Sequence, residues 1–130
     1  MEDNDLVLAA WQAREMAHAP YSGFAVGAAL LAEGGRVFTG CNVENLSYGL
    51  TICAERVAMG TAITAGERRF LKLVVVADTS VPISPCGACR QVMAEFGVPV
   101  AVLVNRKERI QFSMEDLLPR VSTGILDRDM

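Results

Sequence analysis

Residues 71–77 read Leu-Lys-Leu-Val-Val-Val-Ala, and this stretch decides the fold class of the sequence. Its residues are almost wholly apolar and several are β-branched, which is typical of a strand covered on both faces. A second run of this kind lies at 100–104. Between the two runs, Pro85 precedes a helix-like segment at about 87–96. The order strand, helix, strand predicts a sheet with helices packed against it.

The segments before this unit add a hairpin and two more helices. Apolar spacing predicts a helix over 3–18. Two apolar runs at 24–31 and 36–41 meet at a pair of glycines, which is typical of a β-hairpin. A further helix is expected over 51–65, where Gly66 provides a stop signal.

The C-terminal part predicts the last strand and helix. A short edge strand is expected over 110–112, and Ser113 is expected to cap a short helix that ends before Pro119. Five strands and four helices in this order predict an α/β fold. We expect a three-layer α/β/α sandwich around a mixed five-stranded sheet, formed by a single domain over 1–130.

Composition restricts the class of partner. The chain has 130 residues, of which 52% are hydrophobic and 21% charged, so a packed globular domain is expected. Its formal net charge is −3, and Lys72 and Lys107 are the only lysines. A nucleic-acid polymer is therefore not expected as a partner, because binding one requires a basic surface.

No membrane association is predicted either. No apolar run approaches the roughly 20 residues that span a bilayer. The first five residues are acidic rather than basic, unlike the start of a secretory signal. We therefore expect a cytoplasmic protein. In that compartment, four cysteines indicate metal ligands or reactive thiols rather than disulfides.

Three of the cysteines lie at predicted helix N-termini. Cys53 is in one helix start, and Cys86 and Cys89 form a Cys-x-x-Cys pair in another. The positive end of a helix dipole stabilises a thiolate, which is the form that binds metal. Three sulfurs suit Zn²⁺ and leave its fourth position open, as in catalytic sites.

Glu55 follows Cys53 by two residues, so its carboxylate is expected to reach a zinc-activated water without ligating the metal. It is the predicted catalytic residue. The order Cys-Ala-Glu, then Pro-Cys-x-x-Cys, is typical of zinc-dependent deaminases.

Less specific interpretations exist for the same cysteines. Cys41 would complete a closed structural zinc site as a fourth ligand, and Cys86 with Cys89 would form a redox pair. Neither interpretation explains Glu55. On its own, Cys41 is best interpreted as a small strand residue, and His18, the one histidine, as a residue near the end of the first helix.

Taken together, the motifs closely resemble the small, homotetrameric cytidine deaminases over about residues 21–119. The resemblance implies one Zn²⁺ per subunit and hydrolytic deamination of cytidine and deoxycytidine in pyrimidine salvage. It also implies a homotetramer with shared active sites. The blocks that carry it are Tyr-Ser-Gly-Phe-Ala-Val-Gly-Ala-Ala at 21–29, Gly-Cys-Asn-Val-Glu-Asn at 40–45, Ser-Tyr-Gly at 47–49, and the two cysteine blocks.

The resemblance also implies roles on the substrate side. Phe24 would pack against the pyrimidine, while Asn42 and Glu44, with Val43 between them, would hold the ribose hydroxyls. Tyr48 would contribute to a neighbouring subunit's site. Backbone groups of Ala54 and near Pro85 would bind the 2-oxo and 4-amino groups. From the residues alone, the preferred interpretation of Phe24 is a core residue, and that of Asn42, Glu44 and Asn45 is turn residues.

The net charge of the proposed zinc site requires a neighbouring cation, and Arg56 is the candidate. Three thiolates and Zn²⁺ leave one negative charge in excess, which weakens the activation of water. Arg56 directly follows Glu55 and is the candidate for compensating that charge, with Arg90 as second choice; the resemblance implies the same role for Arg56. The alternative is a solvated Arg56 paired with Glu55 on the surface.

One difference from the family bears on the substrate. Relatives carry an aromatic residue shortly after the Leu-Leu-Pro at 117–119, whereas no aromatic follows Phe112 here. An aliphatic lid would allow a modified cytosine nucleoside or a blasticidin-type antibiotic as the substrate. A non-enzymatic zinc module is a third hypothesis, and the acidic balance opposes a nucleic-acid-editing deaminase.

Overall fold

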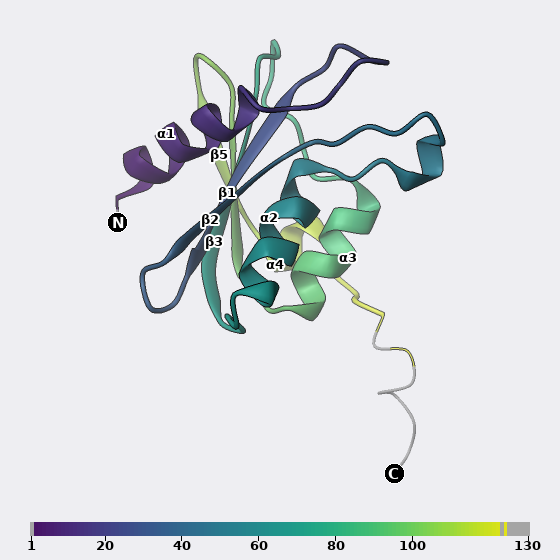
Figure 1. The fold of residues 1–130 in the computed structure, drawn as a ribbon. Coiled ribbons are helices and arrows are strands. Elements are labelled where there is room, and N and C mark those ends of the chain that lie inside the picture. Colours follow the sequence, from purple (N-terminus) through teal and green to yellow (C-terminus); the bar gives the residue numbers. More distant parts are fainter. Residues whose placement is uncertain (1, 123, 125–130) are drawn as a thin grey trace.

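The computed structural model describes residues 2–122 and 124 of the chain, and the expected elements are present in the expected order. Figure 1 shows them arranged around one twisted sheet. The elements are α1 (Asp3–Arg14), β1 (Val26–Ala32), β2 (Val37–Cys41), the 3-10 turn η1 (Tyr48–Leu50), α2 (Ala54–Thr64), β3 (Phe70–Ala77), α3 (Gly87–Glu95), β4 (Val100–Val104), β5 (Arg109–Ser113) and α4 (Met114–Leu117).

The sheet has five strands in the order β2-β1-β3-β4-β5. β1 pairs antiparallel with both β2 and β3, β3 pairs parallel with β4, and β4 pairs antiparallel with β5. The parallel pair is the one joined through a helix, as a crossover requires. The predicted mixed sheet is confirmed.

The strand that decided the fold class is buried on both faces because helices cover both sides of the sheet. Val74 and Val76 of β3 pack in a cluster with Leu6 of α1. Leu73 and Val75, which alternate with them, pack in a second cluster with residues of α2, α3 and α4. Figure 1 shows α1 on one side of the sheet and the other helices on the opposite side. The three-layer prediction is thus confirmed.

The expected element boundaries differ from the observed ones by two or more residues at three places, and two of these differences share one cause. The first helix ends at Arg14 rather than 18, and α2 begins at Ala54 rather than 51. Both segments leave the helices because His18 and Ile52 each form a β-bridge with Val43. The third is the first hairpin strand, which begins two residues later than expected, at Val26. The expected Ser113 cap is confirmed, since its hydroxyl oxygen accepts from the backbone N–H of Asp116.

Two glycines let a helix approach the sheet on each face. A methyl group on Gly27 would lie 2.0 Å from the carbonyl oxygen of Ala10 in α1. A methyl group on Gly40 would lie 2.4 Å from the carbonyl oxygen of Ala54 and 2.5 Å from the backbone nitrogen of Ala58. Side chains larger than hydrogen are therefore excluded at both contacts. Gly40 sets how closely the first turn of α2 approaches β2.

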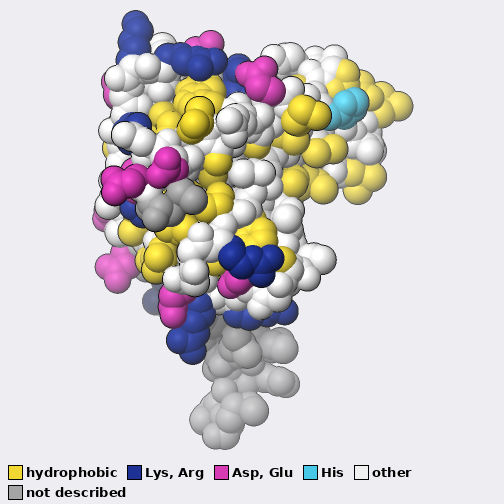
Figure 2. Space-filling view, turned by 60° about the vertical axis from the view of Figure 1, so that its left-hand side comes forward, with side chains coloured by type: hydrophobic (Ala, Val, Ile, Leu, Met, Phe, Trp, Pro, Cys, Tyr) yellow, Lys and Arg dark blue, Asp and Glu magenta, His cyan; other side chains and the backbone are white. Residues whose placement is uncertain are grey.

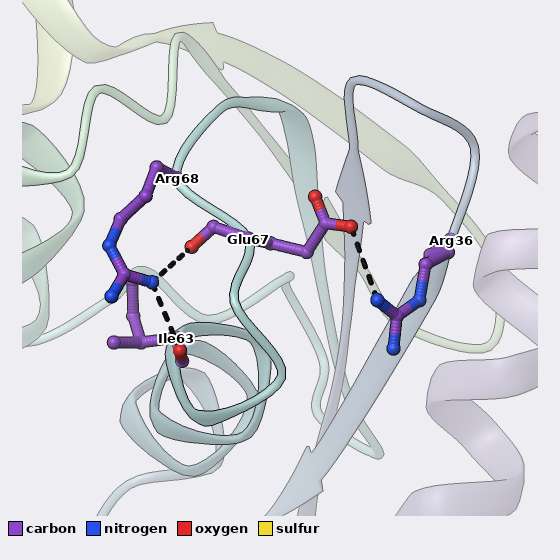
Figure 3. A network of polar contacts seen from close by, with 4 residues as sticks. All are labelled: Arg36, Ile63, Glu67 and Arg68. Atoms are coloured by element: carbon purple, nitrogen blue, oxygen red, sulfur yellow. Dashed lines mark hydrogen bonds and ion pairs between the residues drawn. The ribbon is translucent and has the colours of Figure 1, made fainter.

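Polar contacts hold the far end of α2 (Figure 3). Arg68 Nη1 donates to the carbonyl oxygens of Ile63 at 3.0 Å and Glu67 at 2.8 Å. The Ile63 carbonyl belongs to the last turn of the helix, where carbonyl groups lack helical partners. Arg36, beside the hairpin turn, donates to Glu67 Oε1 at 3.4 Å. The segment that follows α2 is thereby tied to the β1–β2 hairpin.

Large hydrophobic side chains are exposed on one projecting part of the molecule. Figure 2 shows hydrophobic side chains gathered on the lobe at the upper right of the view. Exposed large hydrophobic residues are frequent in residues 43–52, which we call the arm, and in the segment between α1 and β1. Exposed examples in these two segments are Met16, Tyr21, Phe24, Leu46, Tyr48 and Leu50. Within the described residues, no helix combines the length and apolar character needed to cross a membrane.

Candidate active site

The structure brings together the three cysteines that the sequence singled out. Cys53 is the N-cap of α2, Cys86 is the N-cap of α3, and Cys89 lies in the first turn of α3. Their sulfur atoms all lie within 4.8 Å of one another, and the Cys53 and Cys86 sulfurs are 3.8 Å apart. We call this group the sulfur cluster. It is the one such group of metal-ligating side chains in the part of the chain that the structure describes.

The cluster has the form expected for zinc. Its members come from two helix N-termini, where unpaired N–H groups favour negative charge. Three thiols suit the sulfur-rich tetrahedral shell of Zn²⁺ and leave its fourth position open. Cys41 is not part of the cluster and lies in β2. A closed four-sulfur site with Cys41 is therefore wrong.

Charge is unevenly divided among the thiols. Hydrogen bonding from the Cys89 thiol, together with Arg56, lowers the pKa of Cys53 to about 5. The Cys89 pKa is raised because its thiol donates to Cys53 and is buried. In the absence of a cation, one thiolate therefore disfavours the next. A divalent cation would relieve this repulsion, since metal binding deprotonates its thiol ligands.

Glu55 is buried beside the cluster, with 4% of its surface exposed. Burial raises the pKa of this carboxyl to about 7, and the negative charge of Cys53 acts in the same direction. A carboxyl in the first turn of α2 is thus kept out of water next to three sulfurs. The alternative in which Glu55 pairs with Arg56 on the surface is wrong because Glu55 is buried.

Arg56 lies against the cluster as charge accounting predicted. Its Nη2 donates to the Cys53 sulfur at 3.7 Å, and its buried Nε has no acceptor among the described groups. A buried N–H without an acceptor is costly, and further thiolate charge would compensate it. Arg90, the second choice, donates instead to the carbonyl oxygens of Pro85 and Leu117, both at 2.8 Å.

Of the residues expected on the substrate side, Val43, Glu44 and Tyr48 lie on the arm and Phe24 lies in the segment 21–24, which we call the strap. Asn42 directly precedes the arm. Asn42 is buried and links to the start of β1. Its Nδ2 donates to the Phe24 carbonyl at 2.7 Å, and its Oδ1 accepts from the Val26 N–H at 2.9 Å. Each of these amide groups retains one more hydrogen-bonding position. Asn45 is a turn residue, since its Oδ1 accepts from the Ser47 N–H at 2.8 Å.

Glu44 is held by the strap. Its Oε1 accepts from the backbone N–H groups of Tyr21 at 2.9 Å and Ser22 at 3.1 Å, and its Oε2 accepts from the Ser22 hydroxyl. The Ser22 hydroxyl is the main reason that the pKa of Glu44 is lowered, assisted by the two N–H groups. Glu44, Ser22 and Tyr48 line a hollow of about 360 Å³.

The arm is joined directly to the sulfur cluster. Val43 and Ile52 exchange backbone hydrogen bonds, each 2.9 Å long, and Ile52 immediately precedes Cys53.

Phe24 is 41% exposed and Tyr48 75% exposed, so the interpretation of Phe24 as a core residue is wrong. Ala54, the first residue of α2, has a backbone N–H that the helix does not use.

Sequence reasoning missed two contributions. Ser22 lies within the block 21–29, but the sequence indicates no role for it because its hydroxyl acts on Glu44, which is 22 residues away. Gly40 was noted only as part of a block, although it positions the first turn of α2. No local signal identifies the partner of either residue. The lid expected after residue 119 extends beyond 122, and positions 123 and 125–126 lie outside the described residues.

The chain matches the family model "Cytidine and deoxycytidylate deaminase zinc-binding region" over residues 1–105. This chain therefore belongs to the cytidine and deoxycytidylate deaminase family. The family model describes a zinc-binding region, and the sulfur cluster is able to hold a metal ion. Zinc is accordingly its cofactor.

Individual relatives agree with this assignment. The chain is 57% identical to a cytidine deaminase of Halalkalibacterium halodurans, covering 95% of this chain and 96% of the relative. It is 49% identical to a cytidine deaminase of Sporosarcina psychrophila, covering 90% and 96%. The crystal structure of cytidine deaminase from Burkholderia pseudomallei is 52% identical, with a TM-score of 0.91, covering 94% of this chain and all of that one. The resemblance inferred from the motifs is confirmed.

Proposed function

We propose that this chain hydrolyses cytidine and deoxycytidine to uridine and deoxyuridine with release of ammonia. The observation that carries this proposal is the buried Glu55 carboxyl beside three convergent thiols. Relatives that share about half of the sequence are named cytidine deaminases. This function would supply uridine nucleosides in pyrimidine salvage.

Cys53, Cys86 and Cys89 are the residues that would hold the zinc ion. When bound, the ion supplies Lewis acidity that makes a water molecule acidic enough to ionise near neutral pH. Glu55 is not one of the three sulfur donors, and its carboxyl is buried beside them. It is therefore placed to exchange protons rather than to complete the metal shell.

Glu55 would move a proton twice in the reaction. It takes a proton from the attacking water and delivers one to ring N3, which makes C4 electrophilic. The water oxygen forms a bond to C4. Glu55 then takes the remaining proton of the new C4 hydroxyl and delivers it to the 4-amino group, the C4–N bond breaks, ammonia leaves, and a carbonyl remains at C4. Water and cytidine are thus converted to uridine and ammonia without net proton change at the carboxyl.

Arg56 would offset the excess negative charge of three thiolates. Its guanidinium donates to the Cys53 sulfur, and its buried Nε has no acceptor among the described groups. Hydrogen bonds to a metal-bound sulfur reduce the charge that the ligand gives to the metal. The residue thereby maintains the acidity on which water activation depends.

The arm and the strap would hold the nucleoside. The exposed Phe24 ring offers a surface for the pyrimidine, while Asn42 and Glu44, flanking Val43, retain hydrogen-bonding positions for the ribose hydroxyls. The free N–H of Ala54 suits the 2-oxo group. These assignments follow the family resemblance, supported by the backbone pairing that joins the arm to Cys53.

The chain would act as a cytoplasmic homotetramer of single domains, in which Tyr48 reaches a neighbouring subunit's site. The exposed hydrophobic side chains of the arm support this proposal, because contiguous apolar surface of this kind marks interaction sites. Light scattering should give the mass of four chains. A fully active monomer would contradict shared sites.

The deciding experiment combines metal analysis with turnover. Wild-type protein should contain one zinc per chain and deaminate cytidine and deoxycytidine, followed by loss of cytosine absorbance. Glu55→Gln should retain zinc while kcat/KM falls by about 10²- to 10⁴-fold, as expected for loss of a general acid and base. Glu95→Gln, at the exposed end of α3, is the matched control and should be unchanged. An active Glu55→Gln variant, or one that loses its zinc, would contradict the assigned role.

A further inference from the structure

Ser22 makes contacts that join two separate parts of the substrate-facing surface. Its hydroxyl oxygen accepts from the backbone N–H of Phe24 at 3.0 Å, and its hydroxyl proton is donated to Glu44 Oε2. Its own backbone N–H donates to Glu44 Oε1 at 3.1 Å. Two of the three donors that reach the carboxylate therefore come from this one residue.

The direction of these hydrogen bonds is determined by chemistry. A serine hydroxyl has one proton and two lone pairs, while a carboxylate is only an acceptor and a backbone N–H only a donor. Because Phe24 donates to the hydroxyl, the proton of Ser22 is left for Glu44. The Ser22 hydroxyl thus accepts from the strap backbone and donates to the Glu44 carboxylate. Hydrogen bonds to ionised groups are stronger than those between neutral groups.

We propose that Ser22 is a positioning residue that fixes the Glu44 carboxylate against the strap, so that the sugar-facing and base-facing contacts keep one geometry. Glu44 lies on the arm, at a partly exposed position beside the hollow. An unrestrained glutamate there would lose rotamer freedom on binding a nucleoside, and a group already held in place avoids that loss. This inference rests on the nucleoside-binding roles proposed for Glu44 and Phe24.

The first test separates binding from chemistry. Ser22→Ala removes the hydroxyl but keeps the backbone N–H. KM for cytidine should rise about tenfold, the loss expected for one hydrogen bond to a charged group. Zinc content, kcat within about twofold and the pH profile of kcat should be unchanged, because the sulfur cluster is untouched. Ser22→Thr restores a hydroxyl and should restore KM.

A double-mutant cycle tests whether Ser22 acts through Glu44. In a Glu44→Ala background, Ser22→Ala should raise KM by less than about twofold, because the group it positions is gone. Additive effects of the two substitutions would overturn the proposal. Ser80→Ala, an exposed serine outside the strap and arm, is the control and should leave KM unchanged.

Uridine binding provides a readout that needs no turnover. Isothermal titration calorimetry should show a Kd for uridine about tenfold weaker in Ser22→Ala and restored in Ser22→Thr. Weakened binding in a chain that does not deaminate cytidine would overturn the proposed reaction but support the role of Ser22. Normal turnover with an unchanged Kd would overturn the role of Ser22 alone, and a wild type that binds no nucleoside would overturn both. Ser22→Cys, whose thiol is a weaker donor, replaces the alanine variant if that variant does not fold.

Discussion

The two faces of the sheet are packed in similar ways but have different chemical content. On one face, α1 closes an apolar cluster around Leu6 and Val74, and Gly27 lets the helix approach the sheet. On the other face, Gly40 plays the same part for α2, but the beginnings of α2 and α3 meet there and bring three thiols together. The reactive thiols therefore come from the N-termini of α2 and α3, whereas apolar packing against the sheet is common to both faces.

The largest effect is expected from a substitution that removes one ligand of the proposed metal centre. Cys86→Ser should abolish measurable zinc binding and lower activity by orders of magnitude, because a ligand of the proposed centre is lost. The melting temperature should also fall, since bound metal stabilises the folded state. Metal analysis, turnover and thermal melting check this.

Cys41→Ser is the matched control, because Cys41 is a half-buried cysteine in β2 outside the cluster. It should keep zinc and activity. Equal zinc loss in both variants would show that the cluster is not the metal centre.

Replacing each of these two glycines by alanine compares the two faces of the sheet directly. Gly40→Ala and Gly27→Ala each introduce a methyl group against helix backbone, and each should cost about 1–3 kcal/mol of unfolding free energy. Only Gly40→Ala should also lower activity per folded molecule, because it displaces the first turn of α2. Urea unfolding and turnover at a temperature where both variants are folded separate the two effects. Equal activity losses would mean that the α1 face also contributes to the site.

A smaller effect is expected at Arg56. Arg56→Gln removes the cation beside Cys53 and should lower kcat/KM or zinc affinity by about 10- to 100-fold, as outer-shell changes do. On the opposite face, Arg106 stacks over Trp11, 3.8 Å from the ring centroid. Arg106→Gln should leave both quantities unchanged, as measured by steady-state kinetics and competition with a zinc chelator. An inert Arg56→Gln would refute charge compensation.

The smallest effect concerns the ion pair that ties α1 to β3. Lys72 Nζ lies 2.6 Å from Asp3 Oδ1, and both side chains are partly exposed. Lys72→Met should change the unfolding free energy by less than about 1 kcal/mol and leave activity unchanged. The difference should shrink at high salt in urea titrations. A loss of activity would link the α1 face to the site.

Comparing sequence with structure shows which signals are local. The alternation at 71–77 and the Cys-x-x-Cys pair depend on neighbouring residues, and both led to correct predictions. The wrong end of the first helix and the wrong start of α2 depend on His18 and Ile52 pairing with Val43, which lies outside both helices. Backbone pairing of this kind satisfies N–H and C=O groups that no local pattern reveals.

The sequence by itself determined the sandwich and singled out the three clustered cysteines and the nearby acid, because hydrophobic period and residue chemistry can be read along the chain. Only the tertiary structure decided that Glu55 is buried, that Arg56 points at Cys53, and that Ser22 holds Glu44. The burial of Glu55 and the contact of Ser22 with Glu44 depend on atoms brought close from distant positions, and the direction of the Arg56 side chain depends on how the start of α2 is packed. Burial, charge and hydrogen bonding at such contacts are set by the packed neighbours rather than by the residue itself.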